Sequence, residues 1–153
     1  MTSSTTSRTI AATPETVFSA FTDPDLLVQW QAPDTMTARI HRHDMRPGGS
    51  YEMSLYYDDP GAPGKSGGNE DRYTATFLEL DPPHRIVESI AFASDDPAVT
   101  QPMHMTVELE PHGDATRVTI SFDNLPAGVS PQDNDEGTRQ SLAKLAHLLT
   151  PGS

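Results

Sequence analysis

The sequence predicts an α+β fold in which a curved antiparallel sheet of about six to seven strands wraps around a long C-terminal helix. Three observations predict this fold. Two short helical segments lie near the N-terminus, apolar and polar residues alternate over residues 35–122, and the last segment has an apolar stripe at helical spacing. The 153 residues show no internal repeat and no second composition block, so we expect a single domain over residues 1–153.

The N-terminal segment predicts a strand followed by two short helices. Residues 1–6 are typical of a disordered polar leader, and Ser7 to Ala12 predict a short first strand. In the next stretch, ATPETVFSAFTDPDLLVQW, Thr13 and Asp23 each precede a proline, which is the order of a capping side chain and a first helical position. Neither helix is long enough to be stable alone, so both must pack on a sheet.

The region from Thr35 to Phe122 predicts the sheet. Apolar residues recur there largely at every second position, in six segments separated by turn residues. The apolar positions of these segments are Met36, Ala38, Ile40, Tyr51, Met53, Leu55, Tyr57, Phe77, Leu78, Leu80, Ile86, Ile90, Phe92, Met103, Met105, Val107, Leu109, Val118, Ile120 and Phe122. One apolar and one polar face are typical of an antiparallel sheet that is covered on a single side.

Two glycine-rich segments predict turns and not anion sites. RPGGS leads into an alternating run, whereas a helix would complete an anion site. We interpret it as a tight turn that starts a strand, with Arg46 free to pair with Asp44 or another surface acid. GAPGKSGG, residues 61–68, resembles the end of a phosphate-binding loop, but its first glycine is misplaced and glycines follow where a helix should begin. The surrounding loop, residues 58–71, is predicted to be mobile.

The last segment predicts a long helix that lies on the open face of the sheet. Ser130 is a capping residue, Pro131 occupies the first helical position, and acids at 133–136 lie where the helix dipole favours negative charge. The apolar stripe consists of Leu142, Leu145, Ala146 and Leu149. Such a stripe must be buried, and the concave face of the sheet is the large apolar surface that remains.

Composition excludes several classes of partner. Ten Lys and Arg against 22 Asp and Glu give a net charge of −12, which repels phosphate backbones and anionic lipid headgroups. We therefore expect neither nucleic acid nor a membrane surface as a partner. The absence of cysteine removes disulfides and thiolate chemistry and agrees with a reducing compartment. Because the sequence has no signal-like or membrane-spanning apolar segment, we expect a cytoplasmic protein.

The titratable residues indicate no catalytic or metal centre. His41 and His43 are spaced to project from the same side of a strand, as zinc ligands do, but no third ligand is evident. The alternation places His41 on the polar face, so solvated histidines are the favoured interpretation. The other histidines expected at the surface are His84, His104 and His112. Since no G-x-S-x-G nucleophile elbow occurs either, we expect no catalytic residue, no metal and no cofactor.

Two features are compatible with either a cavity or a solid core. Trp30, the only tryptophan, ends the second short helix, where its indole would line a cavity mouth or pack in the core. Met36, Met53, Met103 and Met105 fall on the inner face. Flexible thioethers suit a surface that adapts to varied apolar guests, but they also fill gaps in an ordinary core. The residues alone leave both interpretations open.

Four motifs, in order, carry a resemblance to a known family: TPETVFSAFTDPDLLVQW, DMRPGGSYEM, LELDPPHRIVES and EGTRQSLAKLAHLL. Together they resemble the bacterial homologues of the activator of the heat-shock protein 90 ATPase (AHSA-like), within the START-like (SRPBCC) superfamily. The resemblance runs from about Arg8 to Leu149. It implies the helix-grip fold, with a hydrophobic cavity between sheet and helix that in different members holds lipids, polyketides, hormones or other small molecules.

The sequence departs from that family at two positions. Members commonly have a second tryptophan directly after the first and a Gly-Trp pair at the start of the last helix, whereas here Gln31 follows Trp30 and Thr138 follows Gly137. If those rings face the cavity, their loss enlarges it or makes it more polar. The chain has no second module to clamp a chaperone dimer, so the resemblance does not carry over the co-chaperone role.

The leading hypothesis is a protein that binds a small apolar or amphipathic ligand between the last helix and the sheet, for sequestration or transport. Apolar burial would supply the affinity, and a few polar groups would fix the orientation of the ligand. Strand alternation and helical phase predict that the ligand-binding wall consists of Trp30, Tyr51, Met53, Leu55, Phe92, Met103, Met105, Thr138, Leu142 and Leu145.

Two other hypotheses belong to different classes. An enzyme of the cyclase, dehydratase or hydrolase kind would need an ionisable group in the cavity. A buried histidine or carboxylate with a displaced pKa beside Trp30 would favour it, and the alternation argues that none is present. An interaction module, for a chaperone or for a second copy in a homodimer, would use the exposed face of the sheet, where Tyr56 and Tyr73 are the only aromatic residues we expect.

Overall fold

A curled antiparallel sheet and a long helix form the body of the protein in the computed structural model, which describes residues 3–32, 36–59, 61, 64, 66–94 and 96–149. Within these residues the sheet has seven strands in the order β1-β7-β6-β5-β4-β3-β2, and every neighbouring pair is antiparallel. The α+β helix-grip architecture predicted from the sequence is confirmed.

Apart from the short α3, which was not predicted, the elements follow the predicted order along the chain. The strands are β1 (Ser3–Ile10), β2 (Met36–His43), β3 (Ser50–Tyr57), β4 (Glu70–Asp81), β5 (Arg85–Phe92), β6 (Met103–His112) and β7 (Ala115–Asp123). The helices are α1 (Pro14–Thr22), α2 (Pro24–Trp30), the short α3 (Pro97–Thr100) and α4 (Pro131–Leu149). Because β1 begins at Ser3, residues 3–6 lie in a strand, and the predicted leader is wrong for them. The mobility of loop 58–71 stays a prediction, since several of its residues lie outside the described ones and β4 already begins at Glu70.

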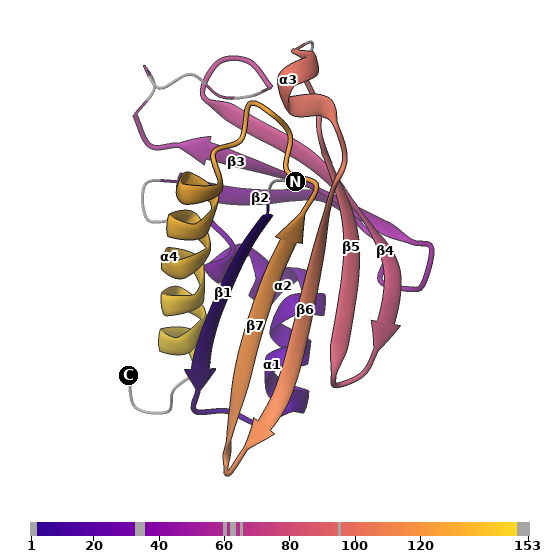
Figure 1. Cartoon of the computed structure of the whole chain (residues 1–153), viewed down its shortest axis with the longest axis vertical. Coiled ribbons are helices and arrows are strands. Elements are labelled where there is room, and N and C mark those ends of the chain that lie inside the picture. Colours follow the sequence, from indigo (N-terminus) through magenta and orange to yellow (C-terminus); the bar gives the residue numbers. More distant parts are fainter. Residues whose placement is uncertain are drawn as a thin grey trace.

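The sheet is strongly curled, and α4 lies beside its β1 edge. Figure 1 shows β2 and β3 running across the direction of β1 and β7, with α1 and α2 also packed on the sheet. At the β1 edge, Thr6 Oγ1 donates a hydrogen bond to Asp135 Oδ1 of α4 at 2.5 Å. The curl therefore produces a bowl whose inner face is covered by helices.

The predicted helix starts are confirmed by their hydrogen bonds. The Thr13 hydroxyl accepts from the backbone N–H of Thr16 at 3.3 Å, and Asp23 Oδ1 accepts from that of Asp25 at 2.9 Å. At the start of α4, Ser130 Oγ accepts from the N–H of Asp133 at 3.3 Å. Each cap satisfies a backbone donor that the helix itself leaves without a partner.

The RPGGS segment is the β2–β3 turn, as predicted. Gly48 has φ +83°, a conformation that favours glycine, and its N–H donates to the Phe77 carbonyl of β4 at 2.8 Å. A Cβ on Gly49 would lie 2.3 Å from the Asp44 carbonyl oxygen, so the turn has no room for a side chain there. Arg46 pairs with Asp44 at 2.8 Å on the surface. The turn therefore docks on a neighbouring strand of the sheet.

Two β-bulges shift the alternation of inward and outward residues. One lies between Ile40 and Arg42 of β2, and the other between Phe77 and Glu79 of β4. The second turns Leu78 outward, where it is 53% exposed, although the sequence placed it on the apolar face. Tyr73 lies before that bulge and faces inward at 4% exposed, so its predicted place on the outer face is wrong.

Candidate functional site

A cavity of about 410 Å³ lies between the inner face of the sheet and the N-terminal half of α4. The lining from the sheet and the two short helices is mainly apolar and includes Phe21, Trp30, Met36, Leu55, Tyr73, Ile90, Phe92, Met103, Met105, Ile120 and Phe122. The lining from α4 and the loop before it is more polar and includes Val129, Ser130, Asp133, Asn134, Glu136, Gly137, Thr138, Gln140 and Ser141. This volume falls in the range of about 300–1,000 Å³ that is typical of small-molecule pockets.

Trp30 shows how the local sequence builds the cavity wall. It is the last residue of α2, and its ring packs edge-on against Phe21 with ring centroids 4.7 Å apart. The indole N–H donates to the carbonyl of Ala20 at 2.9 Å, so its polar atom already has a partner. Two side chains of α4 also hydrogen-bond to backbone carbonyls that directly follow α2. The cavity wall at Trp30 is therefore fixed by contacts with α1 and by hydrogen bonds from α4.

Six of the ten predicted ligand-binding residues line this cavity. These six are Trp30, Leu55, Phe92, Met103, Met105 and Thr138. The other four, which do not line it, are Tyr51, Met53, Leu142 and Leu145, and all of them are at most 1% exposed. They pack in the solid part of the core. Contact of any of the ten with a ligand stays a prediction.

The two positions at which the sequence departs from the family it resembles, Gln31 and Thr138, both line the cavity. Thr138 Oγ1 donates back to the Asn134 carbonyl of its own helix at 2.7 Å. Small or polar side chains therefore stand at these points of the lining, as the sequence comparison implied for a larger or more polar cavity.

The charged side chains among the described residues that line the cavity are all acids. Asp71 of β4 is only 4% exposed, and Tyr57 Oη donates to its Oδ2 at 3.0 Å. Burial, followed by the nearby Asp71 charge, raises the pKa of Tyr57 to about 12. Asp133 and Glu136 add two more carboxylates from exposed positions on α4. Among the described residues that line the cavity, none is Lys, Arg or His.

Glu88 of β5 is a buried carboxyl that the sequence analysis did not identify. It is 1% exposed, and Tyr51 Oη donates a hydrogen bond to its Oε1 at 3.1 Å. Burial raises the pKa of Glu88 to about 7, and the hydrogen bond from Tyr51 opposes that shift. The expectation concerned a buried carboxylate beside Trp30, and Glu88 does not line the cavity that Trp30 lines. The signal was available, because Glu88 alternates in phase with Ile86 and Ile90, both of which were assigned inward.

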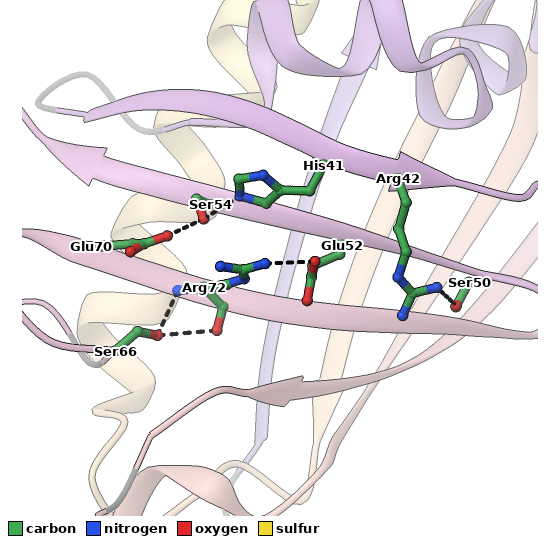
Figure 2. Close-up of polar contacts among 8 residues, drawn as sticks. All are labelled: His41, Arg42, Ser50, Glu52, Ser54, Ser66, Glu70 and Arg72. Carbon is green, nitrogen blue, oxygen red and sulfur yellow. Dashed lines mark hydrogen bonds and ion pairs between the residues drawn. The ribbon is translucent and has the colours of Figure 1, made fainter.

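On the outer face, His41, Ser54 and Glu70 form a chain of hydrogen bonds that links β2, β3 and β4 (Figure 2). His41 Nε2 lies 2.8 Å from Ser54 Oγ, and Ser54 donates to Glu70 Oε2. A catalytic triad needs the histidine between the serine and the acid, whereas here the serine lies between the other two. Ser54 is also 0% exposed, so no substrate reaches it. This chain of hydrogen bonds has a structural role.

The two histidines of β2 do not form a metal site. The bulge after Ile40 places them on different sides of the strand, so the prediction that they project from the same side is wrong. His43 faces inward and stacks on Tyr51 with ring centroids 5.9 Å apart, and burial lowers its pKa. In the described part of the chain, no group of three or more His, Cys, Asp or Glu side chains is arranged to hold a metal ion.

The other histidines that the sequence analysis expected at the surface lie there. His84, His104 and His112 are exposed. Lys65, the basic residue of the sequence that resembles a phosphate-binding loop, lies outside the described residues.

Comparison with known proteins identifies the family. The sequence matches the family described as Activator of Hsp90 ATPase homolog 1-like protein (AHSA1) over residues 11–150. The chain belongs to this family. The AHSA1 membership confirms the resemblance that the four sequence motifs carried, and no curated protein matches the sequence. Among the described helices, none has both the length and the hydrophobicity that crossing a membrane requires.

Solved structures of bacterial proteins show how closely the AHSA1 fold is kept. Protein CV1439 from Chromobacterium violaceum is 30% identical, with a TM-score of 0.87 and 97% of both chains covered. The Mll3558 protein from Rhizobium loti is 32% identical, with a TM-score of 0.73 and coverage of 97% of this chain and 96% of that chain. The AHSA1 protein from Silicibacter pomeroyi, at 22% identity, a TM-score of 0.78 and 97% coverage of both chains, is similar in fold.

Proposed function

We propose that this AHSA1-family protein binds a small hydrophobic or amphipathic molecule in the cavity between α4 and the sheet, and so sequesters or transports it. The observation that carries the proposal is the cavity of about 410 Å³ with an apolar floor and a few polar groups along the α4 wall. A solid interior packed to native density would leave no such space. Membership of the AHSA1 family supports the same proposal, because the resemblance to this family implies a cavity between sheet and helix.

Apolar burial supplies the affinity in this proposal. Each Å² of apolar surface that a ligand removes from water contributes about 25 cal/mol. The aromatic rings and the thioethers of Met103 and Met105 form a floor that can adapt to ligands of different shape. The polar groups on the α4 side then orient the ligand and do not drive its binding.

A fluorescent probe tests the proposal. The uncharged dye N-phenyl-1-naphthylamine is expected to bind the purified protein and to gain fluorescence. Thr138→Trp places an indole in the cavity and is expected to weaken binding by about tenfold or more, because overfilled sites cost about 1–3 kcal/mol. Ala143→Trp adds the same ring at an exposed position of α4 outside the cavity lining and serves as the matched control.

Three results are informative, provided that thermal unfolding shows both variants folded. Loss of binding in Thr138→Trp alone supports the proposal. Equal binding by the wild type and both variants contradicts the assignment of this cavity. Absence of any binding to the wild type, by this dye and by a panel of other uncharged dyes, contradicts the proposed function itself.

A second candidate is an acid–base enzyme that uses the same cavity. The buried carboxylate of Asp71 in the cavity wall favours it, since a desolvated carboxylate beside a phenol is a candidate proton acceptor. Conversion of a bound compound by the wild type that Asp71→Asn abolishes, with binding retained, would favour this candidate. Conversion that persists in Asp71→Asn would exclude Asp71 as the base.

A further inference from the structure

Three buried side chains form a polar row at the edge of the cavity. Tyr73 of β4 lines the cavity, and Tyr51 of β3 and Glu88 of β5 lie behind it. The exposed fractions of the three side chains are 4%, 1% and 1%. Tyr51 Oη donates to Glu88 Oε1 at 3.1 Å, and the rings of Tyr51 and Tyr73 meet edge to face with centroids 6.0 Å apart. Polar groups buried so deeply in an apolar core are costly and call for an explanation.

The hydroxyl of Tyr73 forms hydrogen bonds with the side chains of Tyr51 and Gln31, but as a donor it has a weak acceptor. It donates to the thioether Sδ of Met53 at 3.2 Å, and sulfur of this kind is a poor acceptor. A hydroxyl hydrogen rotates about its C–O bond, so this donor can turn from the sulfur to an oxygen atom of a bound molecule. Folding has already removed the hydroxyl from water. A ligand oxygen would therefore gain a hydrogen bond at little further desolvation cost on the protein side.

Tyr51 and Glu88 orient that donor. Burial, and after it the charge of Glu88, raises the pKa of both phenols, and a hydrogen bond links the hydroxyls of Tyr51 and Tyr73. Burial raises the pKa of Glu88 itself to about 7, so near neutral pH its carboxyl carries a proton for much of the time. A protonated Glu88 can donate to Tyr51, which frees the Tyr51 proton for Tyr73 and the Tyr73 proton for the cavity. Chains of this kind strengthen each of their hydrogen bonds.

The charges around the cavity restrict the ligand further. Asp71 precedes Tyr73 by two residues on the same face of β4, which places the two about 7 Å apart along the strand. Asp133 and Glu136 supply two more carboxylates, and no described lining residue is basic. Arg139 pairs with Glu136 but does not line the cavity. A carboxylate or sulfonate headgroup would be repelled by the acids of the lining, whereas an uncharged oxygen would not.

We propose that Tyr73, positioned by Tyr51 and Glu88, is a hydrogen-bonding subsite for one oxygen atom of an uncharged, largely apolar ligand, such as a ketone, an aldehyde or a phenol. The proposal rests on the ligand-binding function proposed above and names the class of compound that this cavity selects. Tyr73 contacts the ligand. Tyr51 and Glu88 act through Tyr73 as positioning residues.

Two aromatic probes with the same ring system test the subsite at about pH 6, below the pKa of Glu88. The probes are 2-naphthol, which has the oxygen, and naphthalene, which lacks it. Tyr73→Phe is expected to weaken 2-naphthol binding by about three- to tenfold, the value of one hydrogen bond, and to change naphthalene binding by less than about twofold. Tyr56→Phe, on the outer face of β3, is the control and is expected to leave both dissociation constants unchanged.

The two proposals fail in different ways in this experiment. If Tyr73→Phe weakens both probes equally, or neither, the oxygen subsite is wrong while cavity binding stands. If neither probe binds the wild type, the cavity-binding function falls and the subsite falls with it. Tyr73→Phe keeps the ring and removes only the hydroxyl, so the variant is expected to fold, and its thermal unfolding verifies this.

The positioning role has its own comparison. Glu88→Gln keeps an uncharged group that can donate to Tyr51 and is expected to retain the 2-naphthol affinity, whereas Glu88→Leu is expected to lower it towards that of Tyr73→Phe. Tyr51→Phe replaces Glu88→Leu if the latter unfolds. Equal 2-naphthol affinity in all of these variants would overturn the positioning role. The carboxylate probe 2-naphthoate is expected to bind about tenfold or more weakly than 2-naphthol, and tighter binding would overturn the selection for uncharged ligands.

Discussion

The two faces of one sheet hold carboxyl groups in opposite ways. On the inner face, Glu88 is buried with a phenol as its partner, and burial raises its pKa to about 7. On the outer face, Glu52 of β3 forms an ion pair with Arg72 of β4 at 2.8 Å, and the hydrogen bond from that arginine lowers its pKa (Figure 2). The same side-chain chemistry thus titrates differently according to whether a cation and solvent are within reach.

This difference separates the polar groups that stabilise the fold from those that the proposed binding site uses. The outer-face groups satisfy one another: Arg42 donates to Ser50 at 2.8 Å, and Ser66 accepts from the Arg72 backbone N–H at 2.7 Å. Their arrangement links neighbouring strands and loops and leaves these groups little hydrogen-bonding capacity for a ligand. The inner-face groups lie beside a cavity and keep a displaced pKa. Natural proteins tolerate such unfavourable groups mainly where they serve function.

The largest expected effect tests the position in β4 at which the alternation of inward and outward side chains shifts. Phe77→Ala removes a ring that is 0% exposed and is expected to lower the unfolding free energy by about 3–5 kcal/mol. Leu78 is the next residue and lies in the bulge. Leu78→Thr is expected to change the unfolding free energy by no more than about 0.5 kcal/mol. Urea denaturation of both variants measures the difference. Comparable losses at the two positions would show that the strand has no bulge there.

A second, somewhat smaller effect concerns pH. The folded-state pKa of Glu88 is about 7 and exceeds its ordinary value of 4.5. Between pH 4.5 and pH 7, Glu88 is therefore largely protonated in the folded state and largely ionised in the unfolded state. The contribution of Glu88 to stability is therefore fully present below pH 4.5 and falls by about 3 kcal/mol as the pH rises through 7. Glu88→Gln is expected to remove this fall. Urea denaturation of both proteins between about pH 4 and pH 9 measures it.

Glu52→Gln is the matched outer-face comparison. Because the pKa of Glu52 is lowered in the folded state, its contribution to stability depends on pH in the opposite direction. The contribution is present above pH 4.5 and is lost as the pH falls through the lower folded-state pKa. Glu52→Gln is therefore expected to alter the acid limb of the stability profile and to leave the fall near neutral pH intact. The same fall near neutral pH in wild type and Glu88→Gln would refute the assignment to Glu88.

The smallest effect is expected from Arg72→Met, which breaks the outer-face ion pair but keeps most of the aliphatic side chain. Solvent and salt screen a pair on the surface, so the loss in unfolding free energy is expected to be much smaller than that for Phe77→Ala and to shrink further in 1 M NaCl. A loss that is large and independent of salt would show that outer-face polarity contributes to stability as strongly as inner-face burial.

The alternation of the sequence predicted the layers of the fold but not every side of every strand. Met103 and Met105 were assigned inward and are buried, because β6 keeps an uninterrupted period of two. Tyr73 was placed on the outer face. Counting back in twos from Leu80 gives that position, whereas counting from Phe77, on the other side of the bulge, places Tyr73 inward, as observed. A bulge has no strong sequence signature here, so its effect on parity was not predictable.

The candidate site could be predicted only in part for a related reason. The distance between α4 and the sheet at each helical turn decides whether an inward residue lines the cavity or packs in the core. No local pattern in the sequence encodes that distance. Leu142 and Trp30 were predicted together, yet only Trp30 lines the cavity. Glu88 was overlooked because carboxylates are rarely fully buried, although the alternation alone would have placed it inside.

The two halves of α4 have separate tasks, and this division bears on how such proteins diversify. The buried residues of the helix, Ser141, Leu142 and Leu145, lie in its second half, whereas the first half supplies most of its share of the cavity wall. Under the proposed ligand-binding function, substitutions between residues 131 and 140 can therefore alter which compound is accepted without disrupting the hydrophobic core. Selectivity can drift along one half of a single helix while the other half keeps the chain folded.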